Sequence, residues 1–386
     1  MNVAQPKRQL RLSFEPGGPV TGSSEEREFR SSLSSVVMLD GGRTLFLGGD
    51  ETVRREPSIE RLTLQPDGAF AGHQSLSLGE FVRLPDPTVD EGRVGEVDIE
   101  GLAVDGGYLW FTGSYCCNRK QPNKNKSVAA QIEQLAKVRR GGNRFLLGRI
   151  PLAESATGSN LAREHDGRSA ARLTEDWLRE LRSDPHLGPF FGMFDANDNL
   201  ALPSKDNGFD VEGLAIGSRA DGSTRLLLGL RGPVLRGFAI VLELSPVSSG
   251  PGSLALQNLP GSDSFYQKHF LDLGGLGIRD LEFDGDELWI LAGPTMVLDG
   301  PVVLYCWRPP FAASTSTDTL TRYEEGNVEL RRELTLPFGE SNDHAEGFAF
   351  LRDGTAPREF VLVYDSPARE RRDEPSGVRA DVFAVD

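Results

Sequence analysis

The sequence is poor in cysteine and histidine, and this scarcity excludes several kinds of site. Its 386 residues include three cysteines and five histidines. No Cys-x-x-Cys pair occurs, and the adjacent Cys116 and Cys117 could close only a strained ring, so we expect reduced thiols and no structural zinc site. The Gly-x-Ser-x-Gly elbow, the P-loop and the His-Glu-x-x-His helix are also missing, so serine-nucleophile, nucleotide and zinc-protease chemistries have no local sign.

Long apolar runs and an excess of positive charge are absent as well. No eighteen apolar residues follow one another, and the N-terminal residues lack the apolar segment of a signal peptide, so we expect a soluble, cytoplasmic protein without a membrane contact. Acidic residues outnumber basic ones, 57 to 42, which gives a formal charge of −15. This charge argues against nucleic acid as a partner and favours solubility or cation binding.

What the sequence does contain is a repeated element. The core of "VDIEGLAVD" (97–105) returns in "GFDVEGLAIG" (208–217) and in "DHAEGFAFL" (343–351). Each copy places a glutamate before a glycine and an apolar pair, at Glu100, Glu212 and Glu346. A regular spacing of such copies is typical of folds built from repeated units, so the spacing bears directly on the fold.

The spacing reveals two more units. Glu212 and Glu346 are 134 residues apart, and Arg279 stands halfway, in "GIRDLEFDGDELWILAG". Alignment on the turn Asp40-Gly41-Gly42 places Ser35 at the equivalent position of an earlier unit, 65 residues before Glu100. The sequence therefore predicts five units, marked by Ser35, Glu100, Glu212, Arg279 and Glu346.

Each unit reads as four short strands joined by turns, which is typical of a β-propeller blade. We predict an all-β protein, a single propeller domain over residues 1–386, with five four-stranded blades. The alternating segment "QLRLSFE" (9–15) is expected to close the ring by joining the last blade. Six blades, or a pair of β-sandwiches with accidental similarity, are the alternatives.

The interval between Glu100 and Glu212 is 112 residues, longer than 67, so an insertion is expected over residues 118–203, within the second blade. Its basic start, "NRKQPNKNKS", is interpreted as a solvated loop. One predicted helix, "SVAAQIEQLAKVRR" (127–140), has an apolar stripe of Val128, Ile132 and Leu135. A second, "LTEDWLRELRSD" (173–184), has Thr174 as N-cap and Leu173, Trp177 and Leu181 on one face. The stripes are expected to pack on a propeller face as a lid or flank, or to serve an oligomer contact.

The repeated position is expected to form a ring, because the innermost strand of every blade lines the central channel. Glu100, Glu212 and Glu346 would meet at the channel mouth, and Asp98 and Asp210, two residues earlier, would point the same way. Such crowding of carboxylates requires compensation. A divalent cation, Ca²⁺ or Mg²⁺, held by these five residues is one solution. A bidentate clamp by Arg279 is another. Alternatively, the glutamates could accept backbone hydrogen bonds between blades and serve only the architecture.

Further side chains are expected at the same mouth, from the ends of neighbouring strands. Ser114, Lys205, Arg231, Arg279 and Asp365 are the candidates for binding a substrate, with the three cations suited to an anionic group. His344 is a candidate proton carrier, although a lone histidine at a strand start is more often a structural hydrogen-bond donor.

The combined motifs resemble the bacterial family of domain of unknown function 3616, from about residue 30 to the end. The segments that carry the resemblance are "DIEGLAVDGGYLWFTGS", "NRFLLGRIPL", "PSKDNGFDVEGLAIG", "LLLGLRGPVLRGFAIVLEL", "GIRDLEFDGDELWILAGPT" and "HAEGFAF". The resemblance implies the fold and no particular activity. More distantly, the Asp-x-Glu-Gly-Leu element is similar to that of phytase-like and esterase-like propellers, which bind calcium through acidic channel residues. Applied to this sequence, the similarity implies calcium binding by Asp98, Glu100, Asp210, Glu212 and Glu346. Arg279 and Ser35 depart from the pattern.

Two functions are compatible with these observations. The first is a divalent-cation-dependent hydrolase of a phosphoester, ester or lactone, with no organic cofactor. The second is a non-catalytic propeller that binds a small-molecule, anionic or protein ligand and uses the acidic ring as architecture. The sequence leaves the substrate, the partner and the oligomeric state open.

Overall fold

A computed structural model describes residues 3–16, 28–53, 55–90, 93–119, 121–191, 194–195, 198–199, 202–219, 222–308, 318–351 and 358–385. Strands dominate these residues, and no helix among them is long and apolar enough to span a membrane. The prediction of an all-β protein is confirmed.

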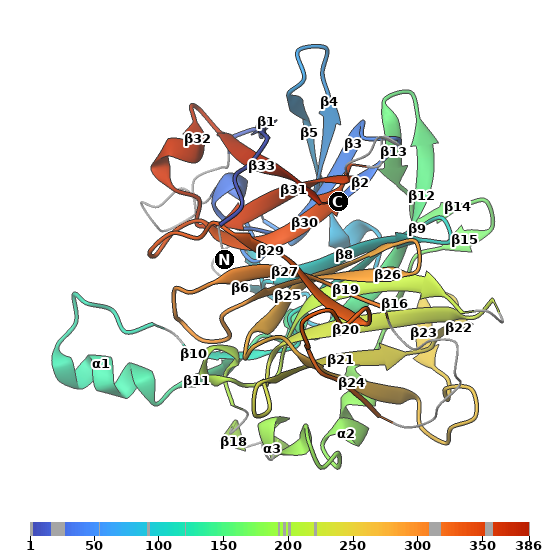
Figure 1. Ribbon diagram of the computed structural model, residues 1–386, viewed down its shortest axis with the longest axis vertical. Helices are drawn as coiled ribbons and strands as arrows, with labels where there is room; N and C mark the ends of the chain where they lie inside the picture. Colours follow the sequence, from blue (N-terminus) through green and yellow to red (C-terminus); the bar gives the residue numbers. More distant parts are fainter. Residues whose placement is uncertain are drawn as a thin grey trace.

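Most strands of the described residues pair in antiparallel meanders of four, which Figure 1 shows packed one after another. The first three meanders are β2 (Leu33–Leu39), β3 (Thr44–Gly49), β4 (Ser58–Leu64) and β5 (Phe70–Ser77); β8 (Ile99–Asp105), β9 (Tyr108–Gly113), β12 (Leu147–Ser155) and β16 (Ala171–Leu173); and β19 (Asp210–Ser218), β20 (Thr224–Gly232), β21 (Phe238–Leu244) and β24 (Tyr266–Asp272). The remaining two are β25 (Gly277–Asp284), β26 (Glu287–Gly293), β27 (Val302–Trp307) and β29 (Leu330–Leu336); and β30 (His344–Phe350), β31 (Arg358–Asp365), β33 (Gly377–Val385) and β1 (Arg8–Ser13).

Shorter elements extend these meanders or connect them. The strands are β6 (Val89–Asp90), β7 (Arg93–Val94), β10 (Cys117–Arg119), β11 (Val138–Arg140), β13 (Gly158–Leu161), β14 (Glu164–His165), β15 (Arg168–Ser169), β17 (Phe194–Asp195), β18 (Asp198–Asn199), β22 (Pro246–Gly250), β23 (Ser253–Leu256), β28 (Thr319–Thr321) and β32 (Arg372–Asp373). The helices are α1 (Val128–Leu135), α2 (Leu178–Leu181) and α3 (Gly188–Phe191), with the 3₁₀ turns η1 (Phe29–Ser31), η2 (Leu78–Glu80), η3 (Gly142–Arg144), η4 (Glu175–Trp177), η5 (Ser204–Asp206) and η6 (Arg369–Arg371).

The first strands of the meanders lie at the centre and contact one another in a ring. β2 contacts β8, β8 contacts β19, β19 contacts β25, β25 contacts β30, and β30 returns to β2. Clusters of buried apolar side chains fill the space between each meander and the next, including the last and the first. Meanders that radiate from a central ring of strands form a β-propeller. Two separate β-sandwiches would not produce this ring, and that alternative is wrong.

The N-terminal strand completes the last meander, as predicted. β1 pairs antiparallel with β33, from Arg8 opposite Val382 to Ser13 opposite Gly377. On its other side β1 touches β5 through a parallel bridge between Leu12 and Phe70. The chain ends are thereby bound to each other and to the first meander, which covers an edge that would otherwise expose unpaired backbone groups.

The glycine after each repeated glutamate is needed because neighbouring inner strands approach closely there. A Cβ on Gly101 would lie 2.6 Å from Leu214 Cβ, one on Gly213 would lie 2.7 Å from Leu281 Cγ, and one on Gly347 would lie 2.8 Å from the Cα of Ser35. The repeated glycine therefore allows neighbouring inner strands to pack closely.

We expect Gly101→Ala to lower the free energy of unfolding by about 1–3 kcal/mol, because the added methyl group must push β8 away from β19. Urea unfolding followed by tryptophan fluorescence measures this change. Gly95→Ala is the control, since its Cβ would meet nothing closer than the Asn143 side chain at 3.6 Å. Unchanged stability of Gly101→Ala would contradict the close approach.

The predicted register of the first unit is wrong by one residue. Leu33 pairs with Gly49 and Ser35 pairs with Gly48, so Ser34, not Ser35, occupies the place of Glu100. The error arose at the turn, because the loop between β2 and β3 spans 40–43 whereas the loop between β8 and β9 spans only 106–107. Aligning the shared Asp-Gly-Gly therefore shifted the whole strand. Ser35 instead corresponds to Gly101 and packs against Gly347.

The predicted insertion over 118–203 is too wide. β12 and β16 lie inside it, yet they are the third and fourth strands of the second meander. What is added to the meander is the excursion of β10, α1 and β11, and the segment of η4, α2 and α3. Residues 120, 192–193, 196–197 and 200–201 of the predicted range lie outside the described residues.

The two predicted helices differ in their packing. Trp177 and Leu181 are buried as expected, and Thr174 stands at the N-cap position of η4, although its hydroxyl donates to Asp176 rather than capping the turn. In α1, by contrast, Val128 is 72% and Ile132 is 62% exposed. Figure 1 shows α1 projecting from the propeller, so the predicted packing of this stripe on a propeller face is wrong for both residues.

Candidate functional site

Each inner strand carries a β-bulge at the repeated position. Glu100 lies between Ile99 and Gly101, which pair with consecutive residues of β9, so Glu100 itself has no partner across the ladder. The same irregularity falls at Glu212, Arg279 and Glu346. Because a bulge turns a side chain out of the normal alternation, it directs these residues toward the centre of the ring.

A cavity of about 440 Å³ lies where the inner strands begin, and we call it the channel mouth. Eight acidic and four basic side chains line it, so its lining is strongly acidic. The lining residues are Asp50, Asp98, Glu100, Cys116, Asn118, Arg119, Gln121, Pro122, Leu135, Arg144, Ser204, Lys205, Asp206, Asp210, Glu212, Arg231, Val297, Glu346 and Asp365. The five predicted metal ligands, Asp98, Glu100, Asp210, Glu212 and Glu346, are all among them.

Three arginines form ion pairs with four of these five carboxylates. Arg231 contacts Asp210 and reaches Glu212 with its other nitrogen, Nη1 to Oε1 at 2.6 Å. Arg279 bridges Glu212 at 3.1 Å and Glu346 at 2.7 Å, and thus joins three meanders. Arg144 meets Asp98 at 2.5 Å. The predicted arginine clamp is therefore present, and it is larger than predicted.

Glu100 is the exception among the five. Its side chain is buried, and no arginine or lysine of the described residues forms an ion pair with it. Burial and the neighbouring carboxylates Asp98, Glu212 and Glu346 raise the pKa of Glu100 well above its usual range. Asp50 shares this environment: its Oδ1 is buried without a hydrogen-bond partner, and burial and Asp365 raise its pKa. Both carboxyl groups therefore keep their protons to higher pH than an ordinary carboxyl group does.

Asp210 is buried like Glu100, but it also pairs with an arginine. Burial raises its pKa and Arg231 lowers it, and with the repulsion from Glu212 and Asp98 the result is a pKa of about 7. A carboxyl group that titrates near neutral pH can both accept and release a proton under physiological conditions. The channel mouth thus holds carboxyl groups of the same chemical type whose pKa values are shifted by different surroundings.

The donor set does not suit a resident metal ion. Within the described ranges, no group of three or more His, Cys, Asp or Glu side chains has an arrangement that could hold a metal ion. The physical reason is the arginines, which bind the carboxylate oxygens that a hard cation such as Ca²⁺ would need. The interleaved guanidinium groups offset part of the negative charge here.

The substrate-binding candidates separate into two groups. Lys205, Arg231 and Asp365 line the channel mouth, and Lys205 is exposed there. Arg279 borders it only through its ion pairs. Ser114 is fully buried, its hydroxyl lies 3.2 Å from Cys116 Sγ, and it is not among the residues that line the channel mouth, so its contact with a substrate stays a prediction.

His344 does not line the channel mouth. It lies beside a small pocket with Arg279 and Asp299, and its Nδ1 is 3.9 Å from Asp365 Oδ2. The hydrogen bond to Asp365 raises the pKa of His344. Its neighbours are those of a surface histidine held by two aspartates, and nothing in this geometry assigns it a proton transfer in the cavity.

Sequence reasoning missed Arg144 and Cys116. Arg144 precedes the third strand of its meander, and no other unit repeats it, so the repeat gave no signal. Cys116 lies against Asp98 and Arg144, and burial raises the pKa of its thiol to about 12. This thiol therefore stays protonated and is not a nucleophile.

The architectural role considered for the glutamates falls to other side chains. Asp280 accepts a hydrogen bond from the backbone N–H of Phe348 at 2.9 Å, and Glu282 accepts one from Phe350 at 2.9 Å. Ser34 donates its hydroxyl to the carbonyl of Ile99. These bonds join neighbouring inner strands. Among the described residues, Glu100 accepts no such bond.

The excursion that carries α1 reaches the edge of the channel mouth. Arg119 donates to Asp206 at 2.9 and 3.0 Å and to the carbonyl of Leu135. Leu135, the last residue of α1, lines the cavity. The predicted lid is thus partly correct, since the C-terminal end of α1 borders the site while the rest of its apolar stripe faces solvent.

Comparison with known proteins gives low similarity outside one family. No curated protein matches the chain. Among solved structures, it is similar to a GH43 β-1,3-galactosidase with galactodeoxynojirimycin (10% identity, TM-score 0.38, covering 96% of this chain and 95% of that one). An exo-β-1,3-galactanase from Clostridium thermocellum gives 9% identity and a TM-score of 0.41, covering 97% and 63%.

A protein of unknown function from Dyadobacter fermentans gives 9% identity and a TM-score of 0.39, covering 99% of each chain. TM-scores this low carry no information about the site or its reaction. A family model matches residues 32–381, and the family, DUF3616, is described as a protein of unknown function.

Proposed function

The chain belongs to the DUF3616 family, and we propose that it is a hydrolase that works by general acid–base catalysis at the channel mouth without a resident metal. The observation that carries this proposal is the contrast between Glu100, buried and without an ion pair to any described arginine or lysine, and Asp210, held by Arg231. Groups of one type whose environments separate their pKa values are the usual pair of acid and base in hydrolysis.

We infer that the four-stranded meanders are five blades, so that the repeated position supplies one channel residue per blade. Ser34, Glu100, Glu212, Arg279 and Glu346 would then form one ring. Asp210 stands two residues before Glu212 and reaches the same cavity. The acid and the base thus come from adjacent blades, and the short, packed inner strands hold them in fixed positions.

In the proposed reaction Glu100 donates its proton to the leaving oxygen of the substrate. Asp210, when ionised, accepts a proton from the attacking water, and the carbon–oxygen bond breaks as the new one forms. Proton exchange with solvent then restores both carboxyl groups. Arg231 keeps Asp210 ionised and oriented, and Arg279 fixes Glu212 and Glu346 behind them.

The acidic lining selects the class of substrate. With eight acidic against four basic side chains, an anionic phosphoester would meet net repulsion, whereas a neutral ester, lactone or acetal would not. The cavity of about 440 Å³ accommodates a small molecule. We therefore favour an uncharged substrate among the esters, lactones and acetals.

The decisive experiment measures hydrolysis of neutral chromogenic esters, lactones and glycosides by the wild-type protein and by Glu100→Gln. We expect kcat/KM to fall at least about 100-fold in the variant, since the general acid is lost. Its thermal midpoint should be unchanged or higher, because a buried carboxyl group without a cation is removed. Glu325→Gln, in an exposed turn, is the control and should keep full activity.

Treatment with EDTA distinguishes this proposal from the metal-dependent one. We expect neither the activity nor the melting temperature to change. A bound ion in the purified protein together with an EDTA-sensitive activity would favour the calcium-type hydrolase. If no substrate is turned over and Glu100→Gln melts below the wild type, the acidic ring is architecture and the protein is a non-catalytic binding propeller.

A further inference from the structure

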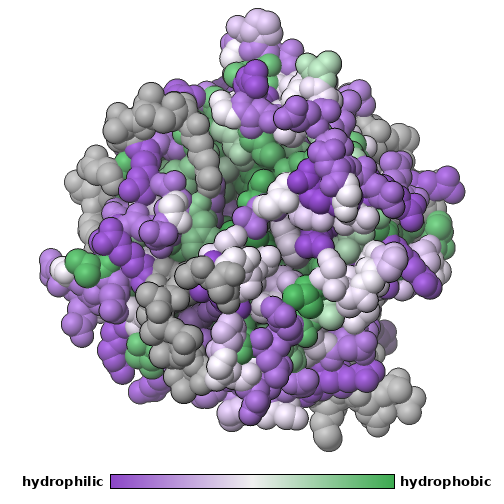
Figure 2. Space-filling view, turned by 90° about the vertical axis from the view of Figure 1, so that its right-hand side faces the viewer, coloured by the Kyte–Doolittle hydropathy of each residue, from purple (hydrophilic) through white to green (hydrophobic). Residues whose placement is uncertain are grey.

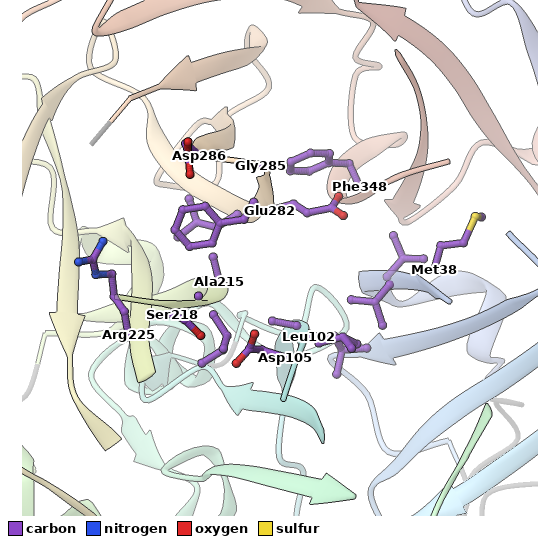
Figure 3. A pocket seen from close by; sticks show the side chains of 18 of the residues that line it. Met38, Leu102, Asp105, Ala215, Ser218, Arg225, Glu282, Gly285, Asp286 and Phe348 are labelled. Carbon is purple, nitrogen blue, oxygen red and sulfur yellow. The ribbon is translucent and has the colours of Figure 1, made fainter. Parts of the chain in front are cut away.

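A second and larger cavity lies at the opposite end of the channel, and we call it the apolar funnel. Its volume is about 800 Å³. It is formed by the second halves of the inner strands, with Met38 from β2, Leu102 from β8, Ala215 from β19 and Phe348 from β30 placed around its opening (Figure 3). It shares no lining residue with the channel mouth, where the same strands begin.

The floor of the funnel is apolar because of the repeated element itself. In the three copies with glutamate and glycine these residues are followed by an apolar run, which supplies Leu102, Ala215 and Phe348. Leu281 follows Arg279 and Asp280 at the equivalent place of the fourth meander. All four are at most 3% exposed, whereas Val104 at the rim is 40% exposed. Figure 2 shows hydrophobic residues in a hollow of this face, surrounded by hydrophilic ones.

The charges around the funnel are unbalanced toward the negative. Arg219 and Arg225 both contact Glu243, at 2.8 and 2.9 Å, so their positive charge is already engaged. Asp105 and Asp286 also line the funnel, and among the described residues no arginine or lysine forms an ion pair with either. Asp105 ends β8 and Asp286 lies in the β25–β26 turn, so two different meanders contribute acidic groups to the rim.

From this arrangement we infer that the apolar funnel is a second ligand site, which binds a small molecule with an apolar body and one positively charged group. The apolar body would displace water from the floor, where transfer of apolar surface is favourable. The positive group would lie at the rim between Asp105 and Asp286. An anionic amphiphile of the same length would be repelled there and would bind more weakly.

Binding is tested with N-phenyl-1-naphthylamine, an uncharged dye whose fluorescence rises in apolar surroundings. We expect saturable binding to the intact wild-type protein. Decyltrimethylammonium should displace the dye at a concentration about fivefold or more below that of decanoate, which corresponds to about 1 kcal/mol of charge preference. Equal displacement by both, or preference for decanoate, would overturn the predicted charge of the ligand.

Two variants locate the site. Val104→Trp fills the rim and should abolish dye binding, while Val328→Trp, at a position 64% exposed in a loop away from the funnel, should not.

The double change Asp105→Asn and Asp286→Asn should keep dye binding and remove the preference for the cation. Dye binding that survives Val104→Trp in folded protein would overturn the assignment. Glu100→Gln should bind dye normally, so this test is independent of the proposed hydrolysis.

Discussion

Replacing Arg231 with methionine is expected to lower the free energy of unfolding by about 3–5 kcal/mol near pH 8, because it leaves the buried Asp210 without its ion pair and Glu212 with Arg279 alone. Arg231 is 8% exposed, and Asp210 and Glu212, its two partners, are 1% and 3% exposed. Methionine keeps most of the side-chain volume, so loss of charge dominates the effect.

The penalty should shrink as the pH falls. In the variant the pKa of Asp210 rises above its value of about 7, since burial remains and the Arg231 cation is gone. A carboxyl whose pKa is higher in the folded than in the unfolded protein takes up a proton on folding at intermediate pH, so its contribution to stability is lost as the pH rises. Lowering the pH from about 8 to about 5 should therefore restore part of the stability relative to the wild type.

Urea unfolding of both proteins at the two pH values measures these effects. Arg8→Met is the control, because Arg8 is half-exposed in its pair with Glu359 and should contribute at most about 1 kcal/mol. A loss for Arg231→Met as small as that of the control, or equal losses at both pH values, would show that the channel mouth is solvated and that its carboxylates do not depend on Arg231.

Asp210→Asn is expected to lower kcat/KM by about 10²–10⁴-fold and to change its pH dependence, because the proposed general base is removed. In the wild type kcat/KM should rise with pH through about 7 as Asp210 ionises. It should fall again at higher pH, where Glu100 loses its proton, since the pKa of that carboxyl is raised well above its usual range. The profile of the wild type is thus bell-shaped.

In Asp210→Asn the acidic limb should disappear while the basic limb remains. A pH profile of kcat/KM between about 5 and 10 for both proteins measures this. A merely structural role for Asp210 would lower the activity without moving either limb. An acidic limb near pH 7 that persists in Asp210→Asn would assign the base to another group.

Much of the fold could be predicted because strands and turns are local features. The alternation in "QLRLSFE" was enough to identify the N-terminal strand, and the pairing of β1 with β33 followed from the missing fourth strand of the last unit. The predicted register of the first unit was wrong because the β2–β3 turn has two extra residues, which only the strand pairing reveals. The exposure of Val128 and Ile132 could not be predicted either, because an amphipathic stripe does not determine which surface it packs against.

The residues of the candidate site were also predicted only in part. The repeat identified Glu100, Asp210, Glu212, Arg279 and Glu346, because equivalent positions of a ring must converge. It missed Arg144, which comes from a strand entrance in one meander only and meets Asp98 through space. The choice between metal and arginine also lay beyond the sequence, since Arg231 reaches its two carboxylates from a neighbouring strand.

The sequence by itself determined that this chain is a repeated all-β structure with an acidic ring and an apolar run behind it. Periodicity and spacing are enough for this, because each depends on residues close together in the chain. Only the tertiary structure decided which carboxylates pair with an arginine and which have a pKa raised by burial beside other carboxylates. Burial and distance between strands set the pKa values of Glu100 and Asp210, and both are properties of packing. The same packing separates the acidic mouth from the apolar funnel, one at each end of the inner strands.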